Sequence, residues 1–131
     1  MKTLIVEDDF VSRRLLQAIL SPYGRCEVAT NGKEAVQAFE LAWQEKDPYN
    51  LICLDIMMPE MDGLQVLAEV RRIEDEKGID GLSGVKIVMT TALDDPRSIM
   101  KAFKQQCEDY LIKPIDRPKL LEKVRNLGLI K

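Results

Sequence analysis

The chain of 131 residues contains no histidine, and this absence excludes several kinds of chemistry. Neither a Ser-His nor a Cys-His catalytic pair can form, and no metal can be held by imidazole. The protein also cannot donate a phosphoryl group from a histidine side chain. Any reaction that it supports must therefore use carboxylates, hydroxyls, amines or thiols.

Cysteines are few, and long apolar runs are missing. Cys26, Cys53 and Cys107 are odd in number, lie far apart and form no CxxC motif. This pattern is typical of reduced, buried thiols in a cytoplasmic protein. No stretch approaches the roughly 18 apolar residues of a membrane span, and the first residues resemble a strand rather than a signal peptide. We therefore expect no membrane insertion.

The size and charge of the chain limit its class further. With 46% hydrophobic residues, it has enough apolar material for one core, and we expect a single domain over 1–131 without an output domain. The net charge of -3 argues against a general nucleic-acid surface, which is normally basic. Direct binding of nucleic acid is therefore not expected.

Patterns typical of strands and helices alternate along the whole chain. Apolar, β-branched segments predict strands at 2–6, 26–29, 51–54, 85–89 and 109–112. Helical spacing and capping residues predict helices over 10–21, 31–45, 64–77 and 95–106, and a last helix that begins at Asp116. In the first helix, Leu15, Leu16, Ile19 and Leu20 form the expected inward face. Right-handed crossovers then predict a parallel sheet between two layers of helices.

Charged residues follow three of these strands at the point where each one ends. Glu7-Asp8-Asp9 follows the first strand, Asp55 follows the third and Lys113 follows the fifth. The carboxyl ends of parallel strands meet at one edge of the sheet, where open α/β sheets bind ligands. Several acids that converge with one ammonium group indicate a site for a small cation and a phosphoryl group.

Further motifs extend this pattern over the whole chain: Met58-Pro59, Met61-Asp62-Gly63, Thr91-Ala92 and Lys113-Pro114. Together with the acidic residues, and in this order, they make the chain resemble the receiver domain of bacterial two-component response regulators. The resemblance implies an α/β, flavodoxin-like, doubly wound sheet of five parallel strands in the order 2-1-3-4-5, with five helices. It also implies phosphorylation of Asp55.

A carboxylate can attack phosphorus and form an acyl phosphate, provided that a cation offsets the repulsion between two anions. Mg²⁺ prefers oxygen ligands and keeps several waters. We expect Asp9 and Asp55 to bind Mg²⁺ directly and Asp8 to act mostly through water. By the resemblance, the backbone carbonyl of Met57 is a further ligand. Glu7 is expected to be a solvated or loop-bonding neighbour, and capping of the first helix is the alternative role for Asp8 or Asp9.

Three residues are expected to bind or report the phosphoryl group. Lys113 would hold a phosphoryl oxygen, and receivers carry a cis peptide between this lysine and Pro114. The hydroxyl of Thr91 would donate to the phosphoryl group, although Thr90 is the alternative hydroxyl. Tyr110 is the expected readout, on the face of the fourth helix, the fifth strand and the fifth helix, with ordinary strand packing as its alternative.

The leading interpretation is a stand-alone response regulator. It would take a phosphoryl group from a histidine kinase or phosphotransfer protein and then bind a downstream protein. The alternatives are a scaffold that works without phosphorylation, or a phosphate sink or relay intermediate. A true aspartate phosphatase would want a second acid where Met57 stands, and a flavodoxin-like cofactor would be repelled by the acids after the first strand.

The partner face has mild basic character, which favours an acidic partner surface. It comprises Arg97, Ser98, Met100, Lys101, Lys104, Tyr110, Lys119 and Lys123. The segment 74–84 is longer than a minimal receiver needs, and it is either a partner-specific elaboration or a neutral loop.

Two apolar residues predict a long-lived phosphorylated state. Met57 and Leu93 stand two residues after Asp55 and Thr91, at the expected entrance to the site. Apolar side chains there should keep water from the acyl phosphate, so self-dephosphorylation should be slow. We expect a Met57→Asn, Leu93→Glu double variant to lose phosphate faster, as followed by intact mass after removal of the donor. A double variant with the wild-type half-life would count against this hypothesis.

Overall fold

The computed structural model describes residues 1–80, 83–92 and 96–131, in which five strands alternate with five α-helices. The strands are β1 (Thr3–Val6), β2 (Cys26–Ala29), β3 (Leu51–Asp55), β4 (Lys86–Thr91) and β5 (Asp109–Ile112). The helices are α1 (Phe10–Leu20), α2 (Gly32–Gln44), α3 (Gly63–Glu76), α4 (Pro96–Lys104) and α5 (Arg117–Asn126), and a short 3-10 helix (Ser21–Tyr23) follows α1.

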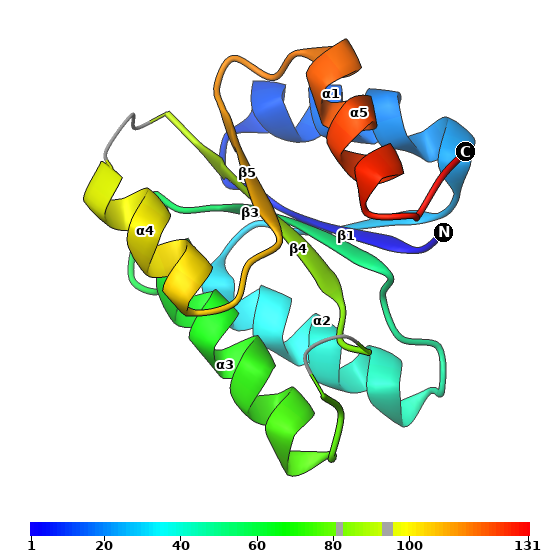
Figure 1. Cartoon of the computed structure of the whole chain (residues 1–131), viewed down its shortest axis with the longest axis vertical. Coiled ribbons are helices and arrows are strands. Elements are labelled where there is room, and N and C mark those ends of the chain that lie inside the picture. The colour runs from blue at the N-terminus through cyan, green and yellow to red at the C-terminus, as the bar shows by residue number, and fades with distance from the viewer. Residues whose placement is uncertain (81–82, 93–95) are drawn as a thin grey trace.

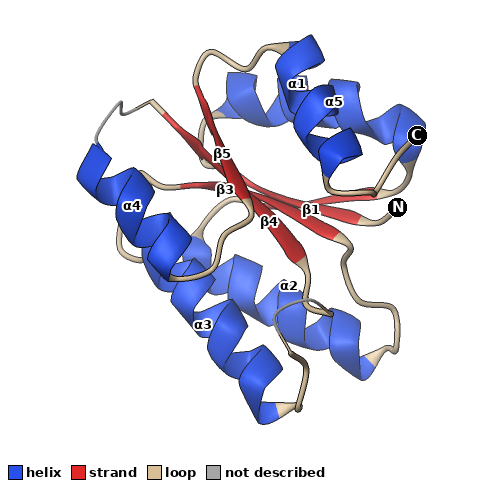
Figure 2. Cartoon of the chain, viewed as in Figure 1, coloured by secondary structure: helices blue, strands red, loops and turns tan. Residues whose placement is uncertain are grey.

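The strands form one parallel sheet in the order β2-β1-β3-β4-β5, which confirms the predicted fold class and strand order. Helices α1 and α5 cover one face of the sheet, and α2, α3 and α4 cover the other (Figures 1 and 2). The central strand β3 is buried along its whole length, as expected for a strand between two helical layers.

The two helical layers cover two apolar clusters, one on each side of the sheet. The cluster under α2, α3 and α4 includes Phe39 and Val70, and the cluster under α1 and α5 includes Leu16 and Leu120. The prediction for Leu15 was wrong, since this side chain is 39% exposed. Residues 16, 19 and 20 already fill the stripe of α1 that faces the sheet, and residue 15 is turned about 100° away from residue 16.

Element ends differ slightly from the sequence prediction. Strand β4 runs to Thr91 rather than to Met89, because its last residues continue the ladder with β3, where Asp55 pairs with Thr90. Helix α4 ends at Lys104, and Gln106 follows it in the left-handed conformation with φ 72°. The expected N-cap of α4, Asp95, lies outside the described residues.

The helix caps follow the sequence with one exception. Asn31 caps α2 by accepting from the backbone of Glu34, and Asp62 forms a complete capping box with Gln65 at the start of α3. Asp116 occupies the N-cap position of α5, but its side chain makes no capping hydrogen bond. Here proline in the first turn supplies the helix-starting geometry.

Arg71, whose side chain is 11% exposed, ties together the ends of α3, β4 and β5 that lie far from the acidic edge. The guanidinium of Arg71 pairs with Glu74 at 2.7 Å and with Glu108 at 2.9 Å. It also donates to the carbonyls of Val85 and Gln106, at 2.9 and 2.7 Å. Both carboxylates accept a backbone N–H as well, from Val85 just before β4 and from Ile87 within it. The charges are therefore compensated where they are buried.

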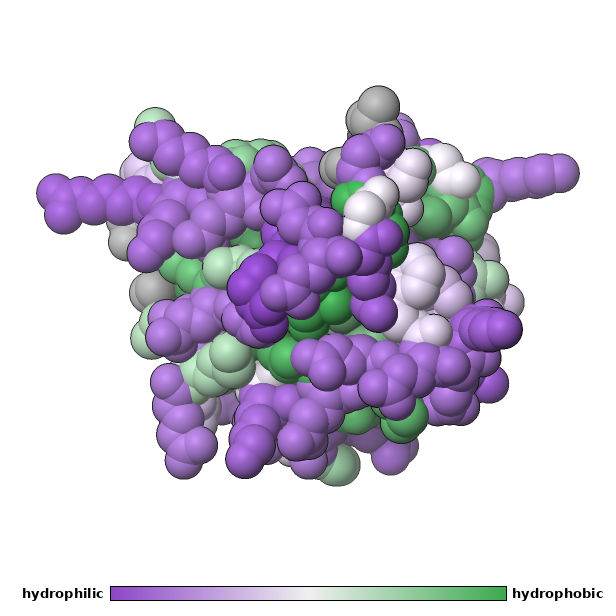
Figure 3. Space-filling model, turned by 90° about the horizontal axis from the view of Figure 1, so that it is seen from below, coloured by the Kyte–Doolittle hydropathy of each residue, from purple (hydrophilic) through white to green (hydrophobic). Residues whose placement is uncertain are grey.

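The surface on the side of α2 and α3 consists mostly of hydrophilic side chains, with apolar groups in small areas between them (Figure 3). Of the helices that the structure describes, none has the length and apolar character to cross a membrane. Cys53 and Cys107 are buried thiols, and Cys26 is half-buried. All three are free cysteines.

We predict that Arg71→Met destabilises the fold by about 3 kcal/mol or more, because it leaves the buried carboxylate of Glu74 and the half-buried carboxylate of Glu108 without their counter-charge. The matched control is Arg72→Met. Its guanidinium also pairs with two glutamates, Glu69 and Glu76, but is 51% exposed. The control should lose less than about 1 kcal/mol. Urea unfolding of both variants measures the difference, and equal losses would contradict the assigned role of Arg71.

Candidate functional site

The carboxyl edge of the sheet brings together the acid that follows β1, the acid that ends β3 and the lysine that follows β5. Val6 pairs with Leu54 in the register of β1 and β3, so Glu7 and Asp55 follow as neighbours. Because side chains alternate along a strand, both point to the face that carries Ile5 and Cys53, the face covered by α1 and α5. The residues that the sequence placed at separate strand ends therefore share one small region.

Three carboxylates form the centre of this region. Oxygens of Glu7, Asp8 and Asp55 lie within 4.8 Å of one another. Glu7 is fully buried and Asp55 is 2% exposed, whereas Asp8 is exposed. Asp55 Oδ1 and Glu7 Oε2 accept no directed hydrogen bond in the described part of the chain. The ammonium of Lys113 is their ion-pair partner, at 2.8 Å from Glu7 and 3.5 Å from Asp55.

The electrostatics of this cluster are unbalanced. Burial raises the pKa of the Asp55 carboxyl, and the neighbouring carboxylate of Glu7 raises that pKa further. Burial acts to lower the pKa of Lys113, but Glu7 and Asp55 together raise it above its ordinary value. Three carboxylates face one ammonium, and two buried oxygens lack a directed donor. This all-oxygen donor set suits a hard divalent cation such as Mg²⁺.

Asp9, which the sequence predicted as a direct metal ligand, takes a different place. Its carboxylate caps α1 and accepts from the backbone N–H of Ser12 at 3.0 Å and from the hydroxyl of Ser12 at 2.7 Å. These hydrogen bonds lower the pKa of Asp9. Glu7, expected to be a peripheral neighbour, is instead fully buried in the acidic cluster.

Two signals in the sequence could have found this arrangement. Glu7 stands two residues after Ile5, as Asp55 stands two residues after Cys53, and side chains two apart share a face. Asp9 has a serine three residues later, at the start of a helical pattern, which is the spacing of an N-cap. The position of the strand end therefore decides which of three consecutive acids faces Asp55.

The loop after Asp55 is held by the start of α3. The N–H of Gly63 donates to the carbonyl of Ile56 at 2.9 Å, and a Cβ on Gly63 would lie 2.2 Å from the carbonyl oxygen of Asp55. Only glycine allows this approach. Met57 is 56% exposed in the same loop, and the ligand role of its backbone carbonyl stays a prediction. Leu93 lies outside the described residues.

Two consecutive threonines end β4, and both are fully buried. The sequence left open whether Thr90 or Thr91 presents its hydroxyl to the site. Because side chains alternate, Thr90 belongs to the face of Asp55 and Thr91 to the opposite face. The carbonyl of Thr91 accepts from the N–H of Lys113 at 2.7 Å, which joins the end of β4 to the lysine.

The peptide between Lys113 and Pro114 is cis, which confirms the prediction. Tyr110 is half-buried between α4 and α5, with its ring edge-on to Phe103 at 5.8 Å. The ammonium of Lys123 lies 5.7 Å from the centre of the Tyr110 ring. The residue is thus placed on the predicted face, and its role as a readout stays a prediction.

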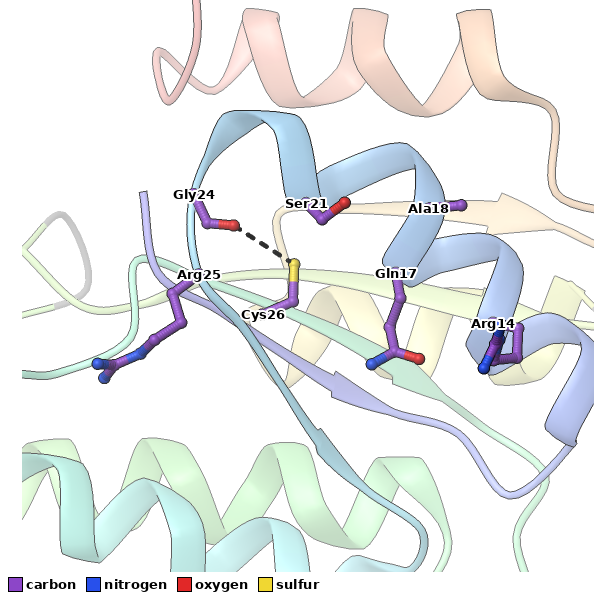
Figure 4. Close-up of a pocket in the computed structure, with 7 residues that line it drawn as sticks. All are labelled: Arg14, Gln17, Ala18, Ser21, Gly24, Arg25 and Cys26. Atoms are coloured by element: carbon purple, nitrogen blue, oxygen red, sulfur yellow. Dashed lines mark hydrogen bonds between the residues drawn. The ribbon is translucent and has the colours of Figure 1, made fainter.

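The surface has one hollow near the acidic cluster and another away from it. One of about 520 Å³ flanks the loop after Asp55 and is lined by Ile56, Met57, Met58, Pro59, Asp62, Leu64 and Ser98. Another of about 450 Å³ lies between α1 and β2 (Figure 4). It is lined by Arg14, Gln17, Ala18, Ser21, Gly24, Arg25 and Cys26, none of which belongs to the acidic cluster.

Comparison with known proteins agrees with this geometry. The sequence model of the response regulator receiver domain family matches residues 3–125. The probable transcriptional regulator ycf27 of Cyanophora paradoxa is 33% identical over 96% of this chain and 47% of its own length. The chemotaxis protein CheY of Halobacterium salinarum is 28% identical, over 96% of this chain and 95% of its own.

A solved structure extends the comparison. It is a co-crystal structure of the Saccharomyces cerevisiae phosphotransfer protein Ypd1 with the receiver domain of the response regulator Ssk1. The match has a TM-score of 0.84 and 30% sequence identity, and it covers 98% of this chain and 88% of that chain. The chain spans half or less of the length of several curated relatives, such as ycf27. The match over 3–125, together with the fold and the acidic edge, shows that this protein belongs to the response regulator receiver domain family of two-component signalling.

Proposed function

We propose that the chain is a phosphorylatable switch that accepts a phosphoryl group on Asp55. The observation that carries this proposal is a nearly buried carboxylate at the sheet edge, beside two further acids and within 3.5 Å of the Lys113 ammonium. The donor would be the phosphohistidine of a histidine kinase or of a phosphotransfer protein. A phosphotransfer protein in the solved Ypd1–Ssk1 structure supports this class of partner.

The transfer is a displacement at phosphorus. A carboxylate oxygen of Asp55 attacks the phosphorus atom, and the bond from phosphorus to the donor nitrogen breaks. The bond pair returns to the imidazole, and the product is an acyl phosphate. Lys113 lies close enough to Asp55 to hold an oxygen of the transferred group and offset its charge.

The residues that would hold Mg²⁺ are Glu7, Asp8 and Asp55. By the family resemblance, the backbone carbonyl of Met57 would be a further ligand. The ion supplies positive charge that offsets the repulsion between the carboxylates and the incoming phosphoryl group. Asp9 is outside this set because its carboxylate is engaged at the N-cap of α1.

The signal would leave the site through the end of β4. Thr91 would donate its hydroxyl to the phosphoryl group, and Tyr110 would respond on the face of α4, β5 and α5. On α4, Met100 is 60% and Phe103 is 43% exposed, and both α4 and α5 carry lysines. Exposed apolar side chains together with lysines fit a protein partner with an acidic surface. We place this exchange in the cytoplasm, where histidine kinases present their phosphohistidine.

The first test is intact mass after incubation with acetyl phosphate, with Mg²⁺ or with EDTA. We expect a gain of one phosphoryl group that requires Mg²⁺ and is absent from Asp55→Asn. No gain in a folded protein that binds Mg²⁺ would favour the alternative, a scaffold that works without phosphorylation. A gain that persists in Asp55→Asn would place the acceptor elsewhere.

The second test separates the two acids on which sequence and structure differ. Glu7→Gln removes a charge from the cluster, and we expect the affinity for Mg²⁺ to fall by at least about tenfold, with phosphorylation slowed accordingly. Asp9→Asn is the matched control because asparagine is an equally good N-cap. It should keep both the affinity and the rate near wild type. Titration with Mg²⁺ and the mass assay measure these effects, and the reverse ranking would restore Asp9 as the ligand.

A further inference from the structure

Thr90 carries a buried hydroxyl that has no role in the reaction proposed above. It is fully buried, and its Oγ1 makes no hydrogen bond to any residue that the structure describes. In the sheet it is the register partner of Asp55. Neighbouring residues of parallel strands point to the same side, so the side chains of Thr90 and Asp55 are neighbours on one face of the sheet.

The two side chains are complementary. A threonine hydroxyl can donate one hydrogen bond, and its hydrogen rotates to suit the acceptor. Asp55 Oδ1 is a buried acceptor that also lacks a directed hydrogen bond within the described residues. A buried hydroxyl without a partner is unfavourable, and valine has the same shape without that penalty. In the structure the two groups are therefore neighbours that are not hydrogen-bonded to each other, and Oδ1 has the Lys113 ammonium as its ion-pair partner at 3.5 Å.

Thr3 shows that a buried hydroxyl alone indicates nothing. It too is fully buried, with an Oγ1 that is unpartnered in the described ranges. It lies at the opposite end of the sheet, however, where its register partners are Cys26 and Leu51. Neither side chain is a carboxylate. What distinguishes Thr90 from Thr3 is therefore the carboxylate of Asp55 beside it, since both hydroxyls are equally buried.

We propose that Thr90 is a positioning residue for phosphoryl transfer to Asp55, an inference that rests on the function proposed above. The hydroxyl is not hydrogen-bonded to Oδ1 in the structure; when the phosphoryl donor binds, it turns to donate to Oδ1 and holds the plane of the carboxylate, so that the other oxygen faces the phosphorus atom. As the bond from phosphorus to the donor breaks, the leaving group takes the bond pair. Thr90 keeps its own proton throughout. Its role is distinct from that of Thr91, which belongs to the opposite face of β4.

The test compares initial rates of phosphorylation by acetyl phosphate with Mg²⁺, followed by intact mass. Thr90→Val removes the hydroxyl and keeps the shape, so we expect a rate about tenfold lower, the factor for one hydrogen bond to a charged group. Thr90→Ser restores the donor and should return the rate to within about twofold of wild type. Thr3→Val is the matched control and should react at the wild-type rate.

Thermal unfolding of each variant accompanies the rates. Thr90→Val should unfold no earlier than wild type, because it removes an unpartnered polar group from the interior. Should it fold poorly, Thr90→Ala supplies a second variant without the hydroxyl. Slow transfer in a stable Thr90→Val, with rescue by serine, supports the positioning role, since loss of packing alone would not be rescued by the smaller residue.

Other outcomes overturn the inference. A wild-type rate in Thr90→Val, or a serine variant as slow as valine, shows that the hydroxyl does not matter. An equal loss in Thr3→Val shows a general effect of buried hydroxyls. A wild-type protein that takes up no phosphoryl group refutes the proposed function itself, and the positioning role with it. That failure is seen in the wild type alone, so it is distinguished from failure of the inference.

Discussion

The site depends on the ion pairing of one ammonium with buried carboxylates at the carboxyl edge of the sheet. Lys113 lies 2.8 Å from Glu7 and 3.5 Å from Asp55, and both acids are almost wholly removed from solvent. Burying such charges is unfavourable unless they compensate one another. The lysine does this only in part, because a third acid, Asp8, adds to the same cluster. The excess of negative charge is what suits the edge to a divalent cation and, by our proposal, to phosphoryl transfer.

The backbone around this cluster is held by contacts that leave little freedom. Asp9 caps the start of α1, two residues after Glu7. Gly63 brings α3 against the carbonyl of Asp55, at a distance that no side chain would permit. At the far ends of β4 and β5, Arg71 joins three elements through a second compensated charge cluster. Charges thus tie the sheet at both ends, while apolar side chains fill the layers between.

The register of the sheet divides the end of β4 between two tasks. Thr90 shares a face with Asp55, whereas Thr91 points to the side of α2, α3 and α4. In our proposals the first hydroxyl orients the carboxylate and the second carries the signal toward Tyr110. Two adjacent residues of the same type can serve such different roles because successive side chains of a strand lie on opposite faces.

Local pattern was sufficient for much of this protein. Apolar runs that end in charge located the strands, and the ordered motifs around Asp55 and Lys113 indicated the family and its strand order. Local pattern was not sufficient for Leu15, for the choice between Glu7 and Asp9, or for the placement of Thr90. A helical stripe is wider than the face that the sheet covers, so only packing decided that Leu15 is exposed. Which acid meets Asp55, and which hydroxyl stands beside it, depends on where β1 ends and how β3 and β4 align. Strand length and register are set by contacts between distant segments, so tertiary structure alone decided them.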